Sequence, residues 1–149
     1  METLHYTEYY LVDALRLAEH FAEKGGRITE GIGRADDFPK PPKTGEFAEP
    51  DVRFVRVELP DRTFAVAFIT EDDPPRSERK FRNKSLYRVL VGEQIRACRE
   101  RRRMTLEEVA ELSGFRAHSL ERIEEGRWDI DIAQLGVILD ALAARLEVV

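Results

Sequence analysis

Residues 104–126, MTLEEVAELSGFRAHSLERIEEG, carry the pattern that decides the fold of the C-terminal half of the chain. Thr105 and Glu108 have the spacing of a capping box, in which each side chain bonds the backbone N–H of the other residue where a helix begins. Gly114 is expected to end this helix, because the positive φ of a tight turn is costly for other residues. A second short helix follows, and Gly126 is its predicted stop.

Two short helices joined by a glycine turn predict a helix-turn-helix motif. The motif requires a small residue where the helices cross closely, and Ala110 meets this requirement. It also requires apolar residues that hold the second helix on the first, and Val109, Leu120 and Ile123 have that spacing. Each residue alone is weak evidence, but their joint spacing beside a capping box favours the motif.

This part of the chain resembles the helix-turn-helix of Xre/Cro-type transcriptional regulators. The resemblance runs from about Val91 to Leu142 and includes GEQIRACRERRRMTLEEVAELSG before the turn and RIEEG after the second helix. It implies a compact, lambda-repressor-like bundle of helices that binds double-stranded DNA as a homodimer.

The resemblance makes the helix over 116–125 the recognition helix, which enters the major groove of DNA. The expected DNA contacts on it are Arg116, Ala117, His118, Ser119, Glu121 and Arg122. The helix dipole disfavours a cation at a helix N-terminus, and a phosphate or guanine edge near Arg116 would reverse that balance. The alternative for Arg116 is a solvated loop arginine, and for His118 an uncommitted surface histidine.

Residues 76–103 are basic within a chain whose formal net charge is -5. They hold 11 basic and 3 acidic residues, against 9 and 16 in residues 1–75 and 4 and 10 in residues 104–149. The net charges are therefore +8, -7 and -6. Residues 76–103, called the basic strip below, form either a phosphate-facing surface or the solvated basic face of a helix. Charge alone does not decide between these two possibilities.

Three arginines near the end of the helix before Thr105 are further expected DNA contacts, namely Arg99, Arg102 and Arg103. On a phosphate backbone they would add affinity without sequence information. The alternative is that they only complement the helix dipole, which favours cations at a helix C-terminus.

The N-terminal half mixes helix and strand patterns. Apolar residues at helical spacing predict an amphipathic helix over 7–24, with Thr7 as its N-cap. Residues 27–34 read as a short strand, and residues 52–59 and 63–70 as the two strands of a hairpin. The proline-rich stretch between the first and second strands predicts an extended loop.

An acidic, proline-rich segment over 71–75 predicts a linker, which gives an N-terminal α+β domain over 1–75 of unknown role and a DNA-binding domain over 76–149. The second domain is expected to be an all-α helix-turn-helix bundle with a last helix over about 131–142 and a short C-terminal strand over 145–149. That strand pairs either with its copy in a second protomer or with the N-terminal hairpin of its own chain.

Other chemistry has little support in the sequence. Phosphate-loop, HExxH and CxxC motifs are not found, and the three histidines are scattered, so we expect no enzyme activity, no cofactor and no metal site. Cys98 lies on an apolar stripe and reads as a buried structural thiol, with a redox sensor as the alternative. A single cysteine and the lack of a signal peptide or membrane span predict a cytoplasmic protein.

The expected function is therefore that of a sequence-specific DNA-binding transcriptional regulator, a dimeric repressor of bacterial or phage type. Two alternatives come from other classes of protein. One is an antitoxin-like regulator, whose N-terminal domain or tail binds a protein toxin. The other is a protein-interaction module whose helix-turn-helix no longer binds DNA.

Overall fold

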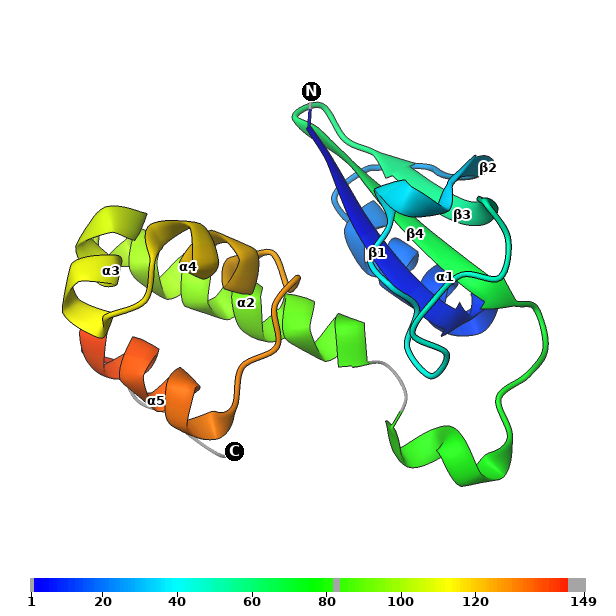
Figure 1. Cartoon of the computed structure of the whole chain (residues 1–149). Coiled ribbons are helices and arrows are strands. Elements are labelled where there is room, and N and C mark those ends of the chain that lie inside the picture. The colour runs from blue at the N-terminus through cyan, green and yellow to red at the C-terminus, as the bar shows by residue number, and fades with distance from the viewer. Residues whose placement is uncertain (1, 82–83, 145–149) are drawn as a thin grey trace. The chain divides into compact units, whose positions relative to one another are not determined.

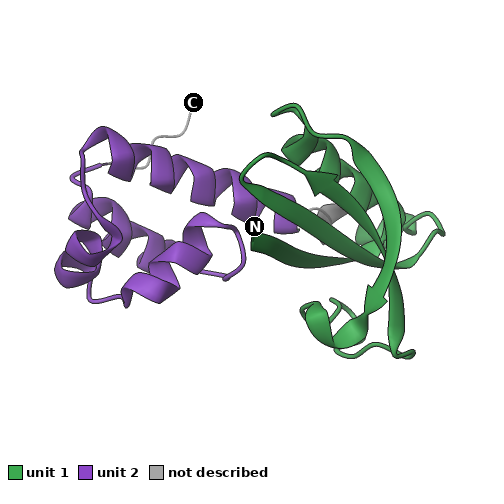
Figure 2. Ribbon diagram, turned by 90° about the horizontal axis from the view of Figure 1, so that it is seen from above, with its two compact units in different colours: residues 1–84 green, residues 85–149 purple. Residues whose placement is uncertain are grey.

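A computed structural model of the chain describes residues 2–81 and 84–144. The chain forms two compact units, Met1–Lys84 and Ser85–Val149 (Figure 2). The division therefore falls at Lys84, whereas the sequence placed the boundary between residues 75 and 76. The reason lies in a 3-10 helix, η2 (Arg76–Phe81), which is attached to the N-terminal unit.

The attachment of η2 depends on Glu78. Its carboxylate accepts a hydrogen bond from the Tyr10 hydroxyl, and one of its oxygens lies 2.6 Å from the Lys43 ammonium nitrogen. The same ammonium group donates to the Tyr10 hydroxyl oxygen at 3.1 Å. These three side chains hold the segment after the linker against the end of the first strand.

The N-terminal unit contains a four-stranded sheet of mixed direction (Figure 1). Its strands are β1 (Glu2–Tyr10), β2 (Ile28–Arg34), β3 (Asp51–Glu58) and β4 (Arg62–Thr70). They lie in the order β1-β4-β3-β2, with β1 parallel to β4 and the other neighbours antiparallel. The predicted strand over 27–34 and the predicted hairpin are both confirmed.

The predicted helix over 7–24 is wrong at its start. Residues up to Tyr10 belong to β1, and α1 begins at Leu11 and ends at Ala22. Thr7 is not an N-cap but a buried strand residue, and its hydroxyl donates to the carbonyl oxygen of Pro39 at 2.7 Å. Pairing with β4 overrode the helical spacing, because it gives the backbone of β1 a complete set of partners on one side.

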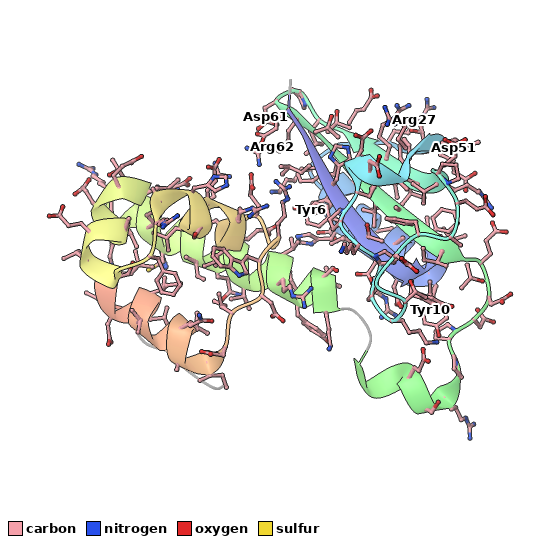
Figure 3. All side chains as sticks on the ribbon, viewed as in Figure 1. Tyr6, Tyr10, Arg27, Asp51, Asp61 and Arg62 are labelled. Carbon is pink, nitrogen blue, oxygen red and sulfur yellow. The ribbon has the colours of Figure 1, made fainter. Side chains whose placement is uncertain are left out.

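The strand ends are easily followed in Figure 3, where Asp61 and Arg62 lie at the β3–β4 turn and Tyr10 lies at the far end of β1. The turn is closed by a hydrogen bond from the Leu59 N–H to the Arg62 carbonyl. Pro60 and Asp61 are its central residues, in agreement with the turn predicted at Pro60-Asp61-Arg62.

The core of the N-terminal unit fills both faces of the sheet. On one face α1 packs with fully buried Ala14 and Leu17, and the Phe21 ring stacks on Phe64 with the ring centroids 3.8 Å apart. On the other face Phe38, from the loop after β2, packs in a cluster with Ala67 of β4. The loop thereby covers apolar surface that the sheet alone would expose.

Over residues 84–144 the C-terminal unit contains four helices, α2 (Lys84–Arg101), α3 (Leu106–Ser113), α4 (Ala117–Glu124) and α5 (Ile132–Ala141). Buried side chains from all four form one core, namely Ile95, Cys98, Val109, Leu120, Ile123, Ile138 and Leu142. The prediction of a buried Cys98 is confirmed. The strand expected over 145–149 lies outside the described residues.

Within the described ranges, 2–81 and 84–144, no helix combines the length and apolar character needed to cross a bilayer.

Candidate nucleic-acid interface

The first helix of the motif, α3, begins as predicted. The Thr105 hydroxyl accepts from the Glu108 backbone N–H, and the Glu108 carboxylate accepts from the Thr105 N–H, both at 3.1 Å. This reciprocal pair satisfies two backbone donors that have no partner inside the helix. The start of α3, which was predicted from Thr105 and Glu108, is therefore confirmed.

The turn after α3 has the geometry that a glycine allows. Gly114 has φ 80 and ψ -2, which is the left-handed conformation, and its N–H donates to the Ala110 carbonyl at 3.0 Å. The next helix, α4, begins at Ala117 with Arg116 in its N-cap position. The Arg116 side chain accepts no hydrogen bond from the first N–H groups of α4. These N–H groups therefore have no capping side chain at the N-cap position.

One face of α4 is buried and the other is exposed. Ser119, Leu120, Ile123 and Glu124 are buried, whereas the predicted contacts on the outer side are exposed, namely Arg116, His118, Glu121 and Arg122. Ala117 is half-buried. Residues three and four apart share a side of a helix, so His118, Glu121 and Arg122 form one outer surface.

The arginines of the C-terminal unit divide into two groups. Four are in ion pairs, and these pairs are Arg88–Asp129, Arg96–Glu100, Arg99–Glu124 and Arg127–Glu125. In the described part of this unit, Arg101, Arg103, Arg116 and Arg122 have no acidic partner within ion-pair distance, and all four are exposed. Arg102 is exposed and donates to the Ala143 carbonyl at 3.0 Å.

These ion pairs reduce the number of unpaired cations in the basic strip over 76–103. Arg88, Arg96 and Arg99 of the strip neutralise acids of the same unit. Residues 76–81, also counted in it, lie in η2 of the other unit. The strip is therefore not one continuous basic surface, and the exposed cations left on the C-terminal unit are fewer than its sequence count indicates.

A family model matches residues within the C-terminal unit. Residues 90–149 match the family model described as a helix-turn-helix domain. These residues form a helix-turn-helix domain. The match supports DNA binding and transcription regulation. No curated protein matches the chain.

Two solved structures are each similar to part of the chain. The clp gene regulator ClgR from C. glutamicum is 31% identical, and the match covers 39% of this chain and 75% of that chain with a TM-score of 0.38. The restriction-modification controller protein C.AhdI from Aeromonas hydrophila is 22% identical, over 40% of this chain and 91% of that chain, with a TM-score of 0.39.

Two of the expected DNA contacts, Arg99 and Ser119, are largely buried within the helix-turn-helix domain. The Arg99 guanidinium makes two hydrogen bonds with the Glu124 carboxylate, at 2.7 and 2.9 Å, and a third with the Met104 carbonyl. Its side chain is 14% exposed and that of Glu124 is 7% exposed. Ser119 is buried because it lies one turn before Ile123 on the side of α4 that faces the core.

A glycine of the helix-turn-helix domain was missed by the sequence reasoning. A Cβ atom on Gly92 would lie 2.4 Å from the Ile123 carbonyl oxygen and 2.5 Å from that of Glu124. The backbone of α2 therefore touches the end of α4 directly. The close helix crossing was expected at Ala110 of α3. Ala110 does pack against the core, but the direct contact with the backbone of α4 is made by Gly92 of α2.

Proposed function

We propose that this protein is a sequence-specific transcriptional regulator of the Xre/Cro type, a repressor that binds double-stranded DNA as a dimer. The observation that carries this proposal is the outer surface of α4. It presents Arg116, His118 and Arg122 to solvent, while the neighbouring arginines Arg99 and Arg127 are paired with acids.

The electrostatics of this surface favour an anionic ligand. Arg116 is held at the N-terminal end of α4, where the helix dipole disfavours a cation, by about 0.3–1 kcal/mol in measured cases. A phosphate beside it would gain from both the guanidinium and the free backbone N–H groups of the helix. A guanine edge would gain from the paired donors of the guanidinium.

The exposed arginines after α2 supply the second part of the surface. Arg102 and Arg103 are exposed where the chain passes from α2 to α3, and we assign them to the phosphate backbone. Contacts of this kind fix the position of a protein on DNA without reading its sequence. Arg99 is left out of this set because its guanidinium is occupied by Glu124 and Met104.

The dimer is supported by α5. Its buried side carries Ile138, yet Ile132 is 80% exposed and Val137 is 44% exposed on the outside. A short helix with apolar residues on both sides gains stability when a second surface covers it. A second copy of the domain would do so. Dimeric helix-turn-helix proteins read two half-sites about 34 Å apart, one turn of the double helix.

The test begins with selection of bound duplexes from a random DNA library by the full-length protein. We expect an enriched, two-fold symmetric site. The logarithm of the association constant should fall linearly with the logarithm of salt concentration, because binding releases counterions from the phosphates. A flat salt response, or no enriched site, would contradict the proposal and favour an interaction module that has lost DNA binding.

Three substitutions then separate base contacts from backbone contacts. Arg116→Ala should relax sequence preference at one position and cost about 1–3 kcal/mol on the selected site. Arg102→Ala should weaken all sequences alike and reduce the salt slope by about one. Arg96→Ala is the matched control, because its guanidinium is already paired with Glu100, and it should change neither quantity.

A further inference from the structure

Strand β2 forms an edge of the N-terminal sheet (Figure 1). It pairs with β3 on one side, from Ile28 opposite Val57 to Arg34 opposite Asp51. Among the described residues no strand follows on its other side, and no backbone hydrogen bond crosses that outer edge. Half of the N–H and C=O groups of β2 are therefore directed toward solvent.

The other edge strand, β1, has chain lying against it. The Thr7 hydroxyl bonds to Pro39, and the Lys43 ammonium lies 4.6 Å from the centre of the Tyr9 ring. The loop after β2 therefore reaches β1, whereas no comparable segment reaches the outer edge of β2 in the described chain. The two edges of the sheet are unequal in this respect.

Strand β2 lacks three of the devices that protect a free edge, and its charged side chains, Glu30 and Arg34, are of opposite sign. Proteins blunt such edges with lysine, proline or a bulge. The segment ITEGIGR contains neither residue type, and its register with β3 is unbroken. Ile32 is 75% exposed. The glycines on both sides of it are required by the inner packing, because a Cβ on Gly31 would lie 2.7 Å from the Phe54 ring.

The charges along β2 are complementary to themselves in one register. If two copies pair antiparallel about Ile32, each isoleucine faces the other, and the Glu30 carboxylate of each copy faces the Arg34 guanidinium of the other. Direct cross-strand pairs of opposite charge and of apolar side chains stabilise an antiparallel sheet. The present partners of both charges are loose, with 3.7 Å from Glu30 to Arg53 and 3.7 Å from Arg34 to Asp36.

Neighbouring registers lack this match. Centring the pair on Gly31 places Ile32 opposite Glu30, and centring it on Gly33 places Ile32 opposite Arg34. Centring it on Glu30 places two carboxylates against each other. Since like or unmatched pairs are unfavourable, only the register centred on Ile32 satisfies the whole strand.

We propose that a second copy of this chain docks on β2, strand against strand and antiparallel, with the two-fold axis at Ile32. The two sheets then form one continuous sheet, and the N-terminal units contribute an interface of their own to the assembly. A single strand pair buries little area, so this contact adds to others rather than replacing them. It does not depend on DNA binding and is tested without DNA.

The first test is a disulfide across the axis. Cα atoms directly opposite each other in an antiparallel pair are roughly 4.5–5.5 Å apart, within the range of about 4.4–6.8 Å that a disulfide spans. Full-length Ile32→Cys, made in a Cys98→Ala background, should form a covalent dimer under oxidised glutathione. The matched control is Val12→Cys on α1, whose side chain is 40% exposed and away from the edge.

We expect Ile32→Cys to cross-link about a hundredfold faster than Val12→Cys, because pairing holds the thiols at high effective concentration. Equal rates in two proteins with normal circular dichroism would overturn the proposal.

A charge exchange in the Ile32→Cys protein tests the register. Glu30→Arg places two cations opposite each other in a symmetric pair, and Arg34→Glu places two carboxylates opposite each other, so each variant alone should cross-link poorly. Mixed in equal amounts, the two variants match at both positions, and cross-linking between them should recover. If the mixture yields no more dimer than the separate variants, a second copy does not occupy β2 in this register and the proposal fails.

Discussion

Arg99 shows how a long-range contact decides the role of a side chain. Sequence reasoning placed it among the DNA contacts because it lies in a run of arginines. In the structure it pairs with Glu124, which is 25 residues further along the chain. Local spacing carries no information about a partner so distant. The burial of Ser119 has a local cause, because Ser119 lies on the same side of α4 as the buried Ile123, and the helical spacing of α4 contained that signal.

Removing one partner of the Arg99–Glu124 pair should destabilise the helix-turn-helix domain. We expect Arg99→Ala to lower the free energy of unfolding by about 3–5 kcal/mol, because it leaves the buried Glu124 carboxylate without its cation. Urea denaturation followed by Trp128 fluorescence measures this. Arg96→Ala removes an exposed pair from the same helix and should have little effect. Equal effects of the two substitutions would show that Arg99 has no special structural role.

The Tyr10–Lys43–Glu78 cluster couples the attachment of η2 to pH. The hydrogen bond from Lys43, followed by that from Tyr10, lowers the pKa of Glu78 below its ordinary value of 4.5. A lowered pKa in the folded state means that the carboxylate contributes stability above pH 4.5. This contribution is lost as the pH falls through the lowered pKa.

An NMR titration of the Glu78 carboxyl should therefore give a midpoint below 4.5, and amide signals of Arg76–Phe81 should change with the same midpoint. Glu78→Gln should remove this transition, because the amide does not titrate. Asp36→Asn, which changes an exposed acid outside the cluster, should leave the transition in place. Titration of the amide signals in Glu78→Gln at the original midpoint would contradict the assignment.

At the scale of elements, the helix-turn-helix was predicted closely and the N-terminal unit only in part. The capping box at Thr105 and the left-handed Gly114 are local signals, so a short stretch of sequence determines α3 and its end. β1 was missed because its residues pair with β4, far along the chain. The helical spacing that begins at Leu11 was then extended backwards into a strand.

The contact between α2 and the end of α4 gives a prediction at this scale. Gly92→Ala should destabilise the domain by about 1–3 kcal/mol, since its methyl group would collide with two backbone carbonyls of α4. Gly136→Ala is the matched control, because nothing lies within 4 Å of a Cβ at that helical position. It should instead stabilise α5 by about 0.5–1 kcal/mol. Thermal unfolding of both variants distinguishes these directions, and a stabilised Gly92→Ala protein would refute the close contact.

At the scale of the whole molecule, the net charge of -5 is a poor guide to the surface. The arginines divide into those that neutralise acids inside the C-terminal unit and those that face solvent. Only the second group is available to phosphates. The proposed DNA affinity therefore depends on a few exposed cations and not on the overall excess of acids.

The two units also differ in the sequence distance that their contacts span. β1 pairs with β4 in a parallel register that places Glu2 opposite Arg62. The helix pairs of the C-terminal unit, such as α3 with α4 and α3 with α5, lie closer together in sequence than β1 and β4 do. Domains with local contacts fold faster than those with distant pairings. In refolding experiments, fluorescence of Trp128, the single tryptophan, should therefore recover before the circular dichroism signal of the sheet, and one common rate would contradict this.

The parallel pairing of β1 has a consequence for synthesis on the ribosome. β1 leaves the ribosome well before its neighbour, because β4 ends only at Thr70. Until then β1 is a nascent segment with unpaired backbone groups, open to chaperones or to other chains. The N-terminal unit therefore completes its sheet by pairing β4 with a strand that was made well before it.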